Sequence, residues 1–302
     1  MMGETGEAIR HLRNHLESDD RLPEKTIMAD PFFQRIERSR DWRRLWSEDW
    51  YTPSDYQRTE AEYLISNARY ADALSILDIL IAKEDDDAVL YCLRGRAHAG
   101  RNDLKNGFAD LNRAILLDRQ VPEFYELRAG MYLRTGRTEE AILDLSQAWT
   151  LAPEKFYLLL DRARAYEKAK APDRALEDGA HYLDYFQEDV VAMLYASELH
   201  LKNGRYFEAL NDLNRALDIN PGEEELYLKR GAIYLATETF EYAERDFTMA
   251  LDLDPFNGST YFQRGLTRLN LQDPNGACYD FKKAFQMGVK QALGYLQDHC
   301  NY

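Results

Sequence analysis

His11 and His15 stand four residues apart, and this spacing places two imidazoles on one face of a helix. Glu7 lies one turn earlier, so the three side chains could supply part of a zinc site. The surrounding segment is polar, and no cysteine or carboxylate motif elsewhere in the sequence converges on it. A solvated helix face explains the pattern better than a metal centre does. We therefore predict no metal ion here.

Other catalytic signatures are missing from the sequence, which has no glycine-rich phosphate loop, nucleophile elbow or metalloprotease helix motif. The acidic run at residues 84–87 lacks the alternating ligands and the glycine of a calcium loop. Three cysteines scattered over more than 200 residues imply neither a disulfide framework nor a zinc motif. We expect reduced thiols at Cys92, Cys278 and Cys300. The sequence thus predicts neither catalysis nor a cofactor.

Charge and hydropathy exclude further classes of function. The 302 residues include 38 basic and 53 acidic side chains, which give a formal net charge of −15. A chain this acidic lacks the basic face that nucleic acids and anionic membrane surfaces require. The longest apolar stretch, Leu74 to Ala82, contains Asp78 and is far shorter than the roughly 20 residues of a membrane-spanning helix. We expect no insertion into a membrane.

An internal repeat of 34 residues organises most of the chain. Small residues recur at this period in three columns, and large, mostly aromatic side chains recur in two more. The most regular column reads Ala73, Gly107, Ala141, Ala175, Ala209, Ala243 and Ala277. Small residues let two short helices cross closely, while the rings fill the adjacent gaps. Each period therefore predicts one pair of packed helices.

This pattern resembles the tetratricopeptide repeat (TPR), in which a large aromatic, a Gly or Ala, a Tyr, two alanines and a terminal Pro recur on 34 residues. The resemblance implies an all-α fold. It is an α-solenoid whose helix-turn-helix units form a right-handed superhelix, and the first helix of each pair lines a concave face. Seven contiguous units cover residues 54–291, and capping helices are expected at both ends. Residues 1–53 then form an N-terminal helical cap. Residues 292–302 form the C-terminal end of the other capping helix and the tail.

The two ends of the array raise separate questions. Residues 3–19 read either as the second helix of a repeat whose first helix is absent, or as an ordinary amphipathic cap. If the repeat is truncated, the chain is a piece of a longer protein, and the sequence then allows a periplasmic or envelope-associated location. If Met1 is the native start, no secretory signal is present and the cytoplasm follows. At the other end, Leu293 and Leu296 should face inward from a helix over residues 290–299.

Trp42, Trp46 and Trp50 recur every four residues, and this spacing places three indoles on one helical stripe. An aromatic stripe of this size must be buried, and we expect it to pack on the first repeat as a cap. The alternative is a second interface, with a partner or with another copy, because tryptophan is enriched at interface hot spots.

Arginine and aspartate also recur in register with the repeat. Aspartate occupies one position in units two to seven, and arginine stands sixteen residues earlier in all of these units except the fifth, which has Ala196. We predict Arg-to-Asp pairs between the two helices of a unit or between neighbouring units. Such pairs fix geometry more than they add stability. Asp212 has no arginine, so it should find another donor or lie in solvent.

The resemblance places function on the concave face, where the first helices carry variable residues. The early units offer mixed charges there, whereas the late units offer almost only apolar side chains. The candidate groove comprises Tyr157, Leu160, Arg164, Val191, Leu194, Leu201, Leu228, Leu235, Phe262, Leu266 and Leu269. The alternative is that the C-terminal helix or the superhelix itself covers this stripe.

The groove suggests a class of partner. TPR proteins that hold acidic chaperone tails use lysines, asparagines and an arginine, but the equivalent positions here carry Glu62, Leu93 and Leu127. An apolar groove flanked by acidic charge instead suits an amphipathic helix or extended segment with basic flanks. We predict a non-catalytic protein-protein interaction scaffold or adaptor that binds such a segment of a partner. The alternative is a self-assembling structural component of a larger complex, in the cell envelope if the chain is a fragment.

Overall fold

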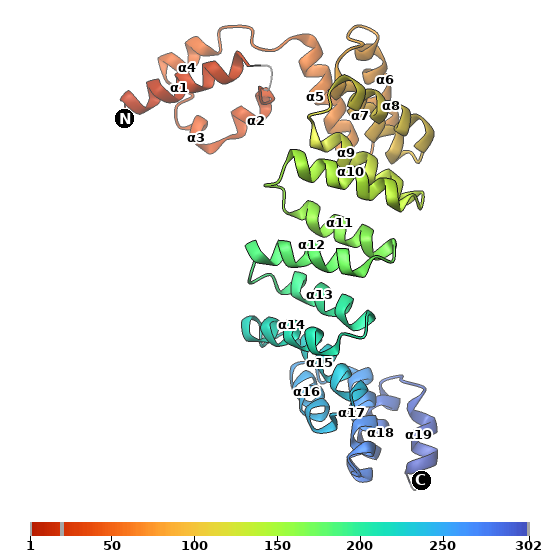
Figure 1. Cartoon of the computed structure of the whole chain (residues 1–302). Helices are drawn as coiled ribbons and strands as arrows, with labels where there is room; N and C mark the ends of the chain where they lie inside the picture. Colours follow the sequence, from red (N-terminus) through yellow and green to blue (C-terminus); the bar gives the residue numbers. More distant parts are fainter. Residues whose placement is uncertain (1, 19–20, 301–302) are drawn as a thin grey trace. The chain divides into compact units, whose positions relative to one another are not determined.

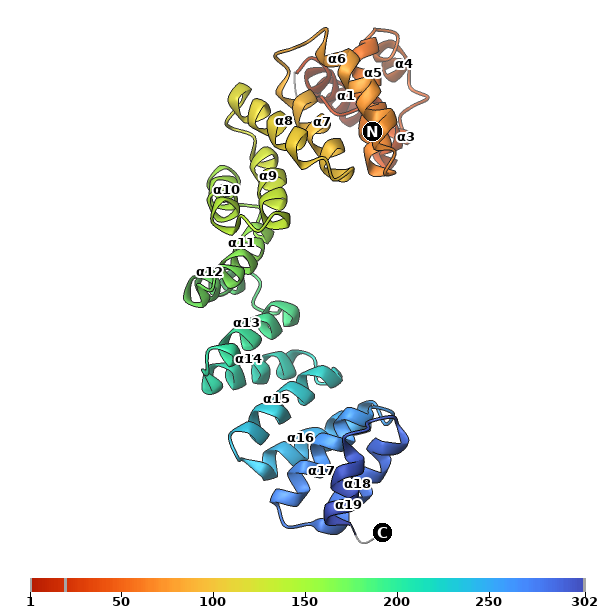
Figure 2. The same cartoon turned by 90° about the vertical axis from the view of Figure 1, so that its right-hand side faces the viewer.

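The computed structural model describes residues 2–18 and 21–300, and these residues form nineteen helices and no strand. The predicted all-α fold is confirmed. The chain divides into two compact units, Met1–Ala152 and Pro153–Tyr302. In both units, successive helices pack as antiparallel pairs joined by short turns (Figures 1 and 2). Among the described helices, none is both long and apolar enough to cross a membrane.

The first unit contains four leading helices and three helix pairs. The leading helices are α1 (Met2–Leu16), α2 (Glu24–Ala29), α3 (Pro31–Gln34) and α4 (Arg40–Leu45). The pairs are α5 (Pro53–Ser66) with α6 (Tyr70–Ile81), α7 (Ala88–Gly100) with α8 (Leu104–Leu117), and α9 (Pro122–Arg134) with α10 (Thr138–Leu151). Each pair corresponds to one period of the sequence.

The second unit contains four helix pairs and a final helix. The pairs are α11 (Tyr157–Lys168) with α12 (Pro172–Tyr185), α13 (Val190–Lys202) with α14 (Tyr206–Ile219), α15 (Glu224–Ala236) with α16 (Phe240–Leu253), and α17 (Gly258–Asn270) with α18 (Pro274–Gln286). The final helix is α19 (Ala292–His299), which packs against α18. An all-α solenoid is therefore the architecture of this chain.

Small residues lie where the helices of each pair cross. The six alanines of the most regular column, from Ala73 to Ala277, are fully buried. Gly265 shows how little room a crossing leaves, because a Cβ atom there would lie 2.7 Å from the Phe281 ring. The close approach predicted from the repeat is confirmed.

The turn inside each helix pair requires a left-handed backbone. Seven turn residues spaced by 34 positions have φ between +57° and +75°, and only two of them are glycine. They are Ala68, Asn102, Gly136, Lys170, Gly204, Glu238 and Gln272. A left-handed conformation at a residue with a Cβ atom costs about 1–2 kcal/mol. Five repeats therefore contain a local strain that Gly136 and Gly204 avoid.

Replacing Glu238 with Gly should stabilise the second unit by about 0.5–1 kcal/mol, because the relief of left-handed strain exceeds the entropy that glycine adds to the unfolded chain. Glu238 is exposed, so little packing is lost. Urea unfolding of purified protein measures the change. The matched control, Gly136→Ala, should be destabilising, and equal effects of both variants would contradict the explanation.

The tryptophans form a core of their own, which corrects the expectation that they cap the first repeat. Trp42 is buried against Leu12, Leu16, Ile27 and Leu45, while Trp46 and Trp50 are half-buried around the same cluster. Within the described residues, this cluster draws only on positions 9–51. The helices α1 and α4 lie side by side because they share it (Figure 1). Trp42 is only 5% exposed, while Trp46 and Trp50 keep part of their surface, so a second interface there stays a prediction for these two.

The cysteines require a second correction. Cys278 and Cys300 form a disulfide across 22 residues, with their Cα atoms 5.8 Å apart. They meet because α19 folds back along α18. Cys92 remains a free, buried thiol, and burial raises its pKa to about 12. The expectation of three reduced thiols was thus wrong for two of them.

The predicted Arg-to-Asp pairs are confirmed, and each joins the two helices of one repeat. The arginine donates from Nε and Nη2 to the two carboxylate oxygens of the aspartate, over 2.6–2.9 Å. The pairs are Arg94–Asp110, Arg128–Asp144, Arg162–Asp178, Arg230–Asp246 and Arg264–Asp280. Bidentate contacts of this kind are strong and geometrically specific.

Several of these arginines bridge a third helix as well. The second terminal nitrogen, Nη1, donates to a residue sixteen positions earlier, on the second helix of the preceding repeat. The acceptors are Asp78, Asn112, Asn214 and Thr248. One guanidinium thus ties together three helices from two neighbouring repeats.

Asp212 behaves differently from both outcomes expected for it. It is only 8% exposed, and its Oδ2 atom has no hydrogen-bond partner in the part of the chain that the structure describes. The nearest basic atom is Nε2 of His200, at 3.6 Å. Burial without a hydrogen-bond donor raises the pKa of Asp212 to about 6. The fifth repeat therefore holds a buried carboxylate that is poorly compensated.

Candidate binding surface

A pocket of about 240 Å³ lies on the first helices α11 and α13 of the second unit. Leu160 and Arg164 line it from α11, and Val191 and Leu194 line it from α13. These four belong to the groove predicted from the sequence, and the fold brings them together. Tyr195, Glu198, Ala192 and the α13 N-cap residue Asp189 complete the lining. We call this the α11–α13 pocket.

The α11–α13 pocket is apolar at its rim. Val191 is 74% exposed, whereas Leu160 and Leu194 are half-buried and Leu194 packs against the core of α13 to α15. An exposed valine beside two half-buried leucines leaves apolar surface that a ligand side chain could cover. The volume is of the order of one large side chain.

Charged groups surround this rim in compensated pairs. Arg164 pairs with Asp161 at 3.0 Å, and Glu198 pairs with Lys229 of α15. Tyr195 donates to Glu167 over 3.3 Å, and burial together with Glu167 raises the pKa of Tyr195. The tyrosine therefore stays protonated at neutral pH. The arrangement offers no activated nucleophile or base, but it offers apolar contact with polar groups at its edge.

The remaining groove residues fall into two groups. Tyr157 and Leu201 are exposed, and Leu228 and Leu235 are half-buried on α15. Phe262, Leu266 and Leu269 pack instead against the C-terminal cluster, where Phe262 makes an edge contact with the Tyr295 ring of α19. These last three residues are only partly buried, so the C-terminal cluster contacts the stripe without burying it completely.

The C-terminal helix also leaves apolar surface of its own. Leu296 is buried as predicted, but Leu293 is 43% exposed, which corrects the inward orientation expected for it. Leu293 lines a pocket of about 420 Å³ with Phe285 of α18. Leu293 therefore lies at the open edge of the contact between α18 and α19.

The first helices of the first unit carry a larger pocket. About 590 Å³ lies among α5, α7 and α9, with Arg96, Glu126 and Arg134 among its lining. Arg134 donates to the Ala99 carbonyl oxygen over 2.9 Å, so its guanidinium is held within the unit. Both pockets combine apolar and charged side chains, so the change from mixed charge to apolar character along the repeats stays a prediction.

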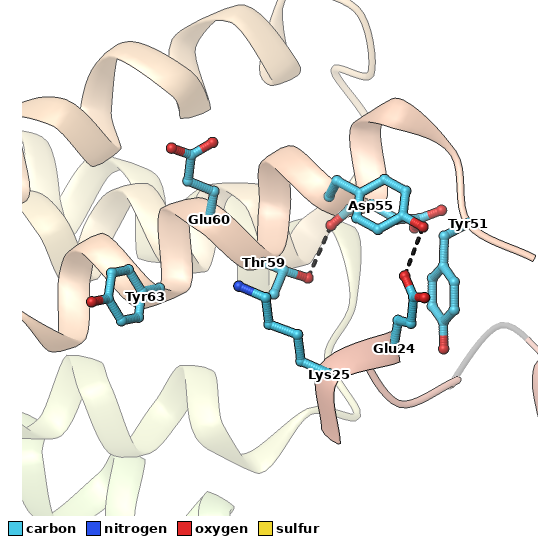
Figure 3. A pocket seen from close by; sticks show the side chains of 8 residues that line it. Glu24, Lys25, Tyr51, Asp55, Thr59, Glu60 and Tyr63 are labelled. Atoms are coloured by element: carbon cyan, nitrogen blue, oxygen red, sulfur yellow. Dashed lines mark hydrogen bonds between the residues drawn. The ribbon is translucent and has the colours of Figure 1, made fainter. Parts of the chain in front are cut away.

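A further pocket, which the sequence did not reveal, lies between α2 and α5 (Figure 3). It measures about 390 Å³ and is lined by three tyrosines, three carboxylates, one lysine and one threonine. The lining residues are Glu24, Lys25, Tyr51, Asp55, Tyr56, Thr59, Glu60 and Tyr63. No sequence pattern could indicate it, because Glu24 and Asp55 are 31 positions apart and lie in different helices.

Internal contacts already use most polar groups of the α2–α5 pocket. The Tyr56 hydroxyl donates to Glu24 over 2.7 Å, which raises the pKa of Tyr56. Burial raises the pKa of Asp55, but hydrogen bonds from Thr52 and Arg21 outweigh it and hold that pKa below its usual value. Figure 3 shows Lys25 extending from α2 toward Thr59. We therefore interpret this pocket as a polar contact region between the leading helices and the first repeat.

One histidine of the N-terminal pair, His15, makes a structural contact. His15 accepts a hydrogen bond at Nε2 from the Leu22 amide over 2.8 Å, which takes up the nitrogen that could have bound zinc. Within the described residues, no cluster of three or more histidine, cysteine or acidic side chains could hold a metal ion. The α11–α13 pocket therefore remains the best candidate for function.

Comparison with known proteins identifies the family. A family model for the tetratricopeptide repeat matches residues 92–156 and 194–258. The chain thus contains tetratricopeptide repeats. These two matched stretches do not establish how many repeats the chain has. Members of this family are generally non-catalytic scaffolds for protein interactions, and this TPR chain shares that architecture.

Relatives and solved structures agree with this assignment. Human tetratricopeptide repeat protein 13 is 28% identical over 179 residues, which are 58% of this TPR chain and 21% of the human protein. The chain thus spans about a fifth of that relative's length. The C-terminal part of a TPR protein from Cytophaga hutchinsonii superposes with a TM-score of 0.70 at 14% identity, over 79% of this chain and 99% of the other. A TPR protein from Parabacteroides merdae superposes with a TM-score of 0.53 at 21% identity, over 81% of this chain and 99% of the other. At these identities the structures show the fold alone.

Proposed function

We propose that this TPR chain is an adaptor that binds an extended or helical segment of a partner protein on the first helices of its second unit. The α11–α13 pocket carries the proposal, because it combines an exposed apolar rim with a floor made by the repeat core. It receives one apolar anchor side chain of the partner. Burying such a side chain contributes about 1.5–3 kcal/mol.

Charge favours a partner segment with basic flanks. The chain has a net charge of −15, and Asp161, Glu167 and Glu198 lie beside the pocket. These three carboxylates are paired with Arg164, Lys202 and Lys229, so the attraction for basic flanks comes from the net negative charge of the chain. One anchor plus surface charge supports modest affinity, because association entropy offsets much of the gain from burial.

A photo-crosslinking experiment tests the location. A photoreactive amino acid at position 191 should label one defined partner in native lysate, and the crosslinked peptide identifies the bound segment. Val89 provides a matched control, because it lies three periods earlier at the same repeat position and is also exposed. Labelling of the same partner from position 89 would place the contact elsewhere.

Val191→Asp should then weaken binding of the identified segment at least about tenfold, since one buried anchor is worth more than 1.4 kcal/mol. Isothermal titration calorimetry with the synthetic segment measures the change, and circular dichroism checks the fold. Val89→Asp should leave the affinity unchanged. Equal affinity of Val191→Asp and wild type would remove the α11–α13 pocket from the binding site.

A further inference from the structure

The fifth repeat has lost an arginine but has kept the aspartate that arginine serves elsewhere. Asp212 is 8% exposed as a residue and 11% exposed in its side chain, and its Oδ2 lacks a hydrogen-bond partner within the described residues. Nδ1 of the neighbouring His200 is likewise buried without a partner there. Burial lowers the pKa of His200, so the imidazole compensates the carboxylate poorly. A buried acceptor of this kind is costly to leave unpaired.

The other repeats show what this carboxylate binds. In five of them the equivalent aspartate receives two parallel hydrogen bonds from a guanidinium over 2.6–2.9 Å. The arginine side chains that supply it are 10–22% exposed, so the guanidinium position borders solvent. The same backbone period holds Asp212 in the same place.

Two positions that supply or contact the guanidinium in other repeats carry alanine in the fifth repeat. Ala196 on α13 replaces the arginine itself. Sixteen positions earlier, where other repeats place an acceptor for Nη1, the fifth repeat has Ala180 on α12. Ala180 is exposed, so this end of the path reaches the surface. Both polar groups that accompany the aspartate elsewhere are therefore missing together.

We propose that Asp212 receives the guanidinium of an arginine from a partner protein, which enters beside Ala180 between α12 and α14. The inserted side chain completes in trans the contact that the other repeats make in cis. A guanidinium is preferred to an ammonium group because its planar fork matches both carboxylate oxygens. None of Ala180, Ala196 and Asp212 lines the α11–α13 pocket, so the two sites use different residues.

Small-molecule complementation tests the proposal directly. Ethylguanidinium at low millimolar concentration, well below the denaturing range, should raise the thermal midpoint of wild type saturably by a few degrees at pH 7.5. Ethylammonium should give no saturable rise. Two variants remove the site in opposite ways, because Ala196→Arg fills it and Asp212→Asn removes the charge. Neither variant should respond to ethylguanidinium.

A peptide arm distinguishes a protein partner from a free guanidinium compound. A short peptide with one central arginine should bind wild type in a calorimetric titration, and its lysine counterpart should not. An equal thermal response of wild type and Asp212→Asn to ethylguanidinium would overturn the proposal, and this comparison does not depend on whether Ala196→Arg folds. A response to ethylguanidinium with no binding of the arginine peptide would overturn the assignment to a protein partner.

Discussion

Arg230→Met should destabilise the second unit by about 3–5 kcal/mol, which is the usual cost of removing one partner of a buried ion pair. Asp246 is only 2% exposed and accepts both of its guanidinium hydrogen bonds from Arg230. Methionine keeps much of the side-chain volume but leaves this carboxylate charged and unpaired. The bridge from Arg230 to Asn214 is lost as well.

Hydrogen exchange measured by mass spectrometry is the suitable readout, because a repeat array opens in parts. Peptides from α15 and α16 should lose protection, and urea unfolding gives the overall change. Arg264→Met is a sharp control, since Arg268 also donates to Asp280 over 2.9 Å and remains in place. Its cost should be smaller. A loss below about 1 kcal/mol for Arg230→Met would show that the pair contributes only geometry.

Asp212→Asn should have the opposite effect and stabilise the protein at neutral pH by about 1–3 kcal/mol. The ordinary pKa of this carboxyl is 3.8, and the fold raises it to about 6. The native state therefore holds the proton more tightly than the unfolded chain does. Wild type loses stability as pH rises from about 4 to 6, and the full cost of the buried charge remains above this window. Asparagine has no such charge.

The difference in unfolding free energy between Asp212→Asn and wild type should thus be large near pH 7.5 and small near pH 4. Urea unfolding at both values measures it. His200 also titrates in this range and lies 3.6 Å away, so the comparison is repeated in a His200→Gln background. A difference that does not change with pH would mean that the fold does not raise the pKa of Asp212.

The 34-residue period allowed most of the fold to be predicted, because each structural requirement is written into the sequence several times. One alanine at a helix crossing carries little information, but the column from Ala73 to Ala277 can have few other causes. The same holds for the arginine and aspartate columns, whose contacts follow from their spacing. The left-handed turns were visible only at Gly136 and Gly204, since the other five positions carry ordinary side chains.

Features that occur once were harder to predict. The Cys278–Cys300 disulfide depends on α19 folding back, and two cysteines 22 residues apart do not indicate this. The tryptophan stripe was correctly judged to need burial, but its neighbours Leu12, Leu16 and Ile27 came from a segment with no repeat to guide its placement. Similarly, the apolar stripe continued in sequence to Leu269, but only the packing of Tyr295 on Phe262 shows where α19 contacts it.

The arginine that bridges three helices also governs how the chain can change in length. Thr248 and Asn214, which accept from Arg264 and Arg230, are one period apart. Removal of residues 224–257 would carry Arg264 to the place of Arg230, where Asn214 would accept from it as it does now from Arg230. Duplication of a whole period works in the same way, while any other insertion leaves a guanidinium facing the wrong neighbour. Evolution can therefore lengthen or shorten this array by whole repeats without redesigning its charges.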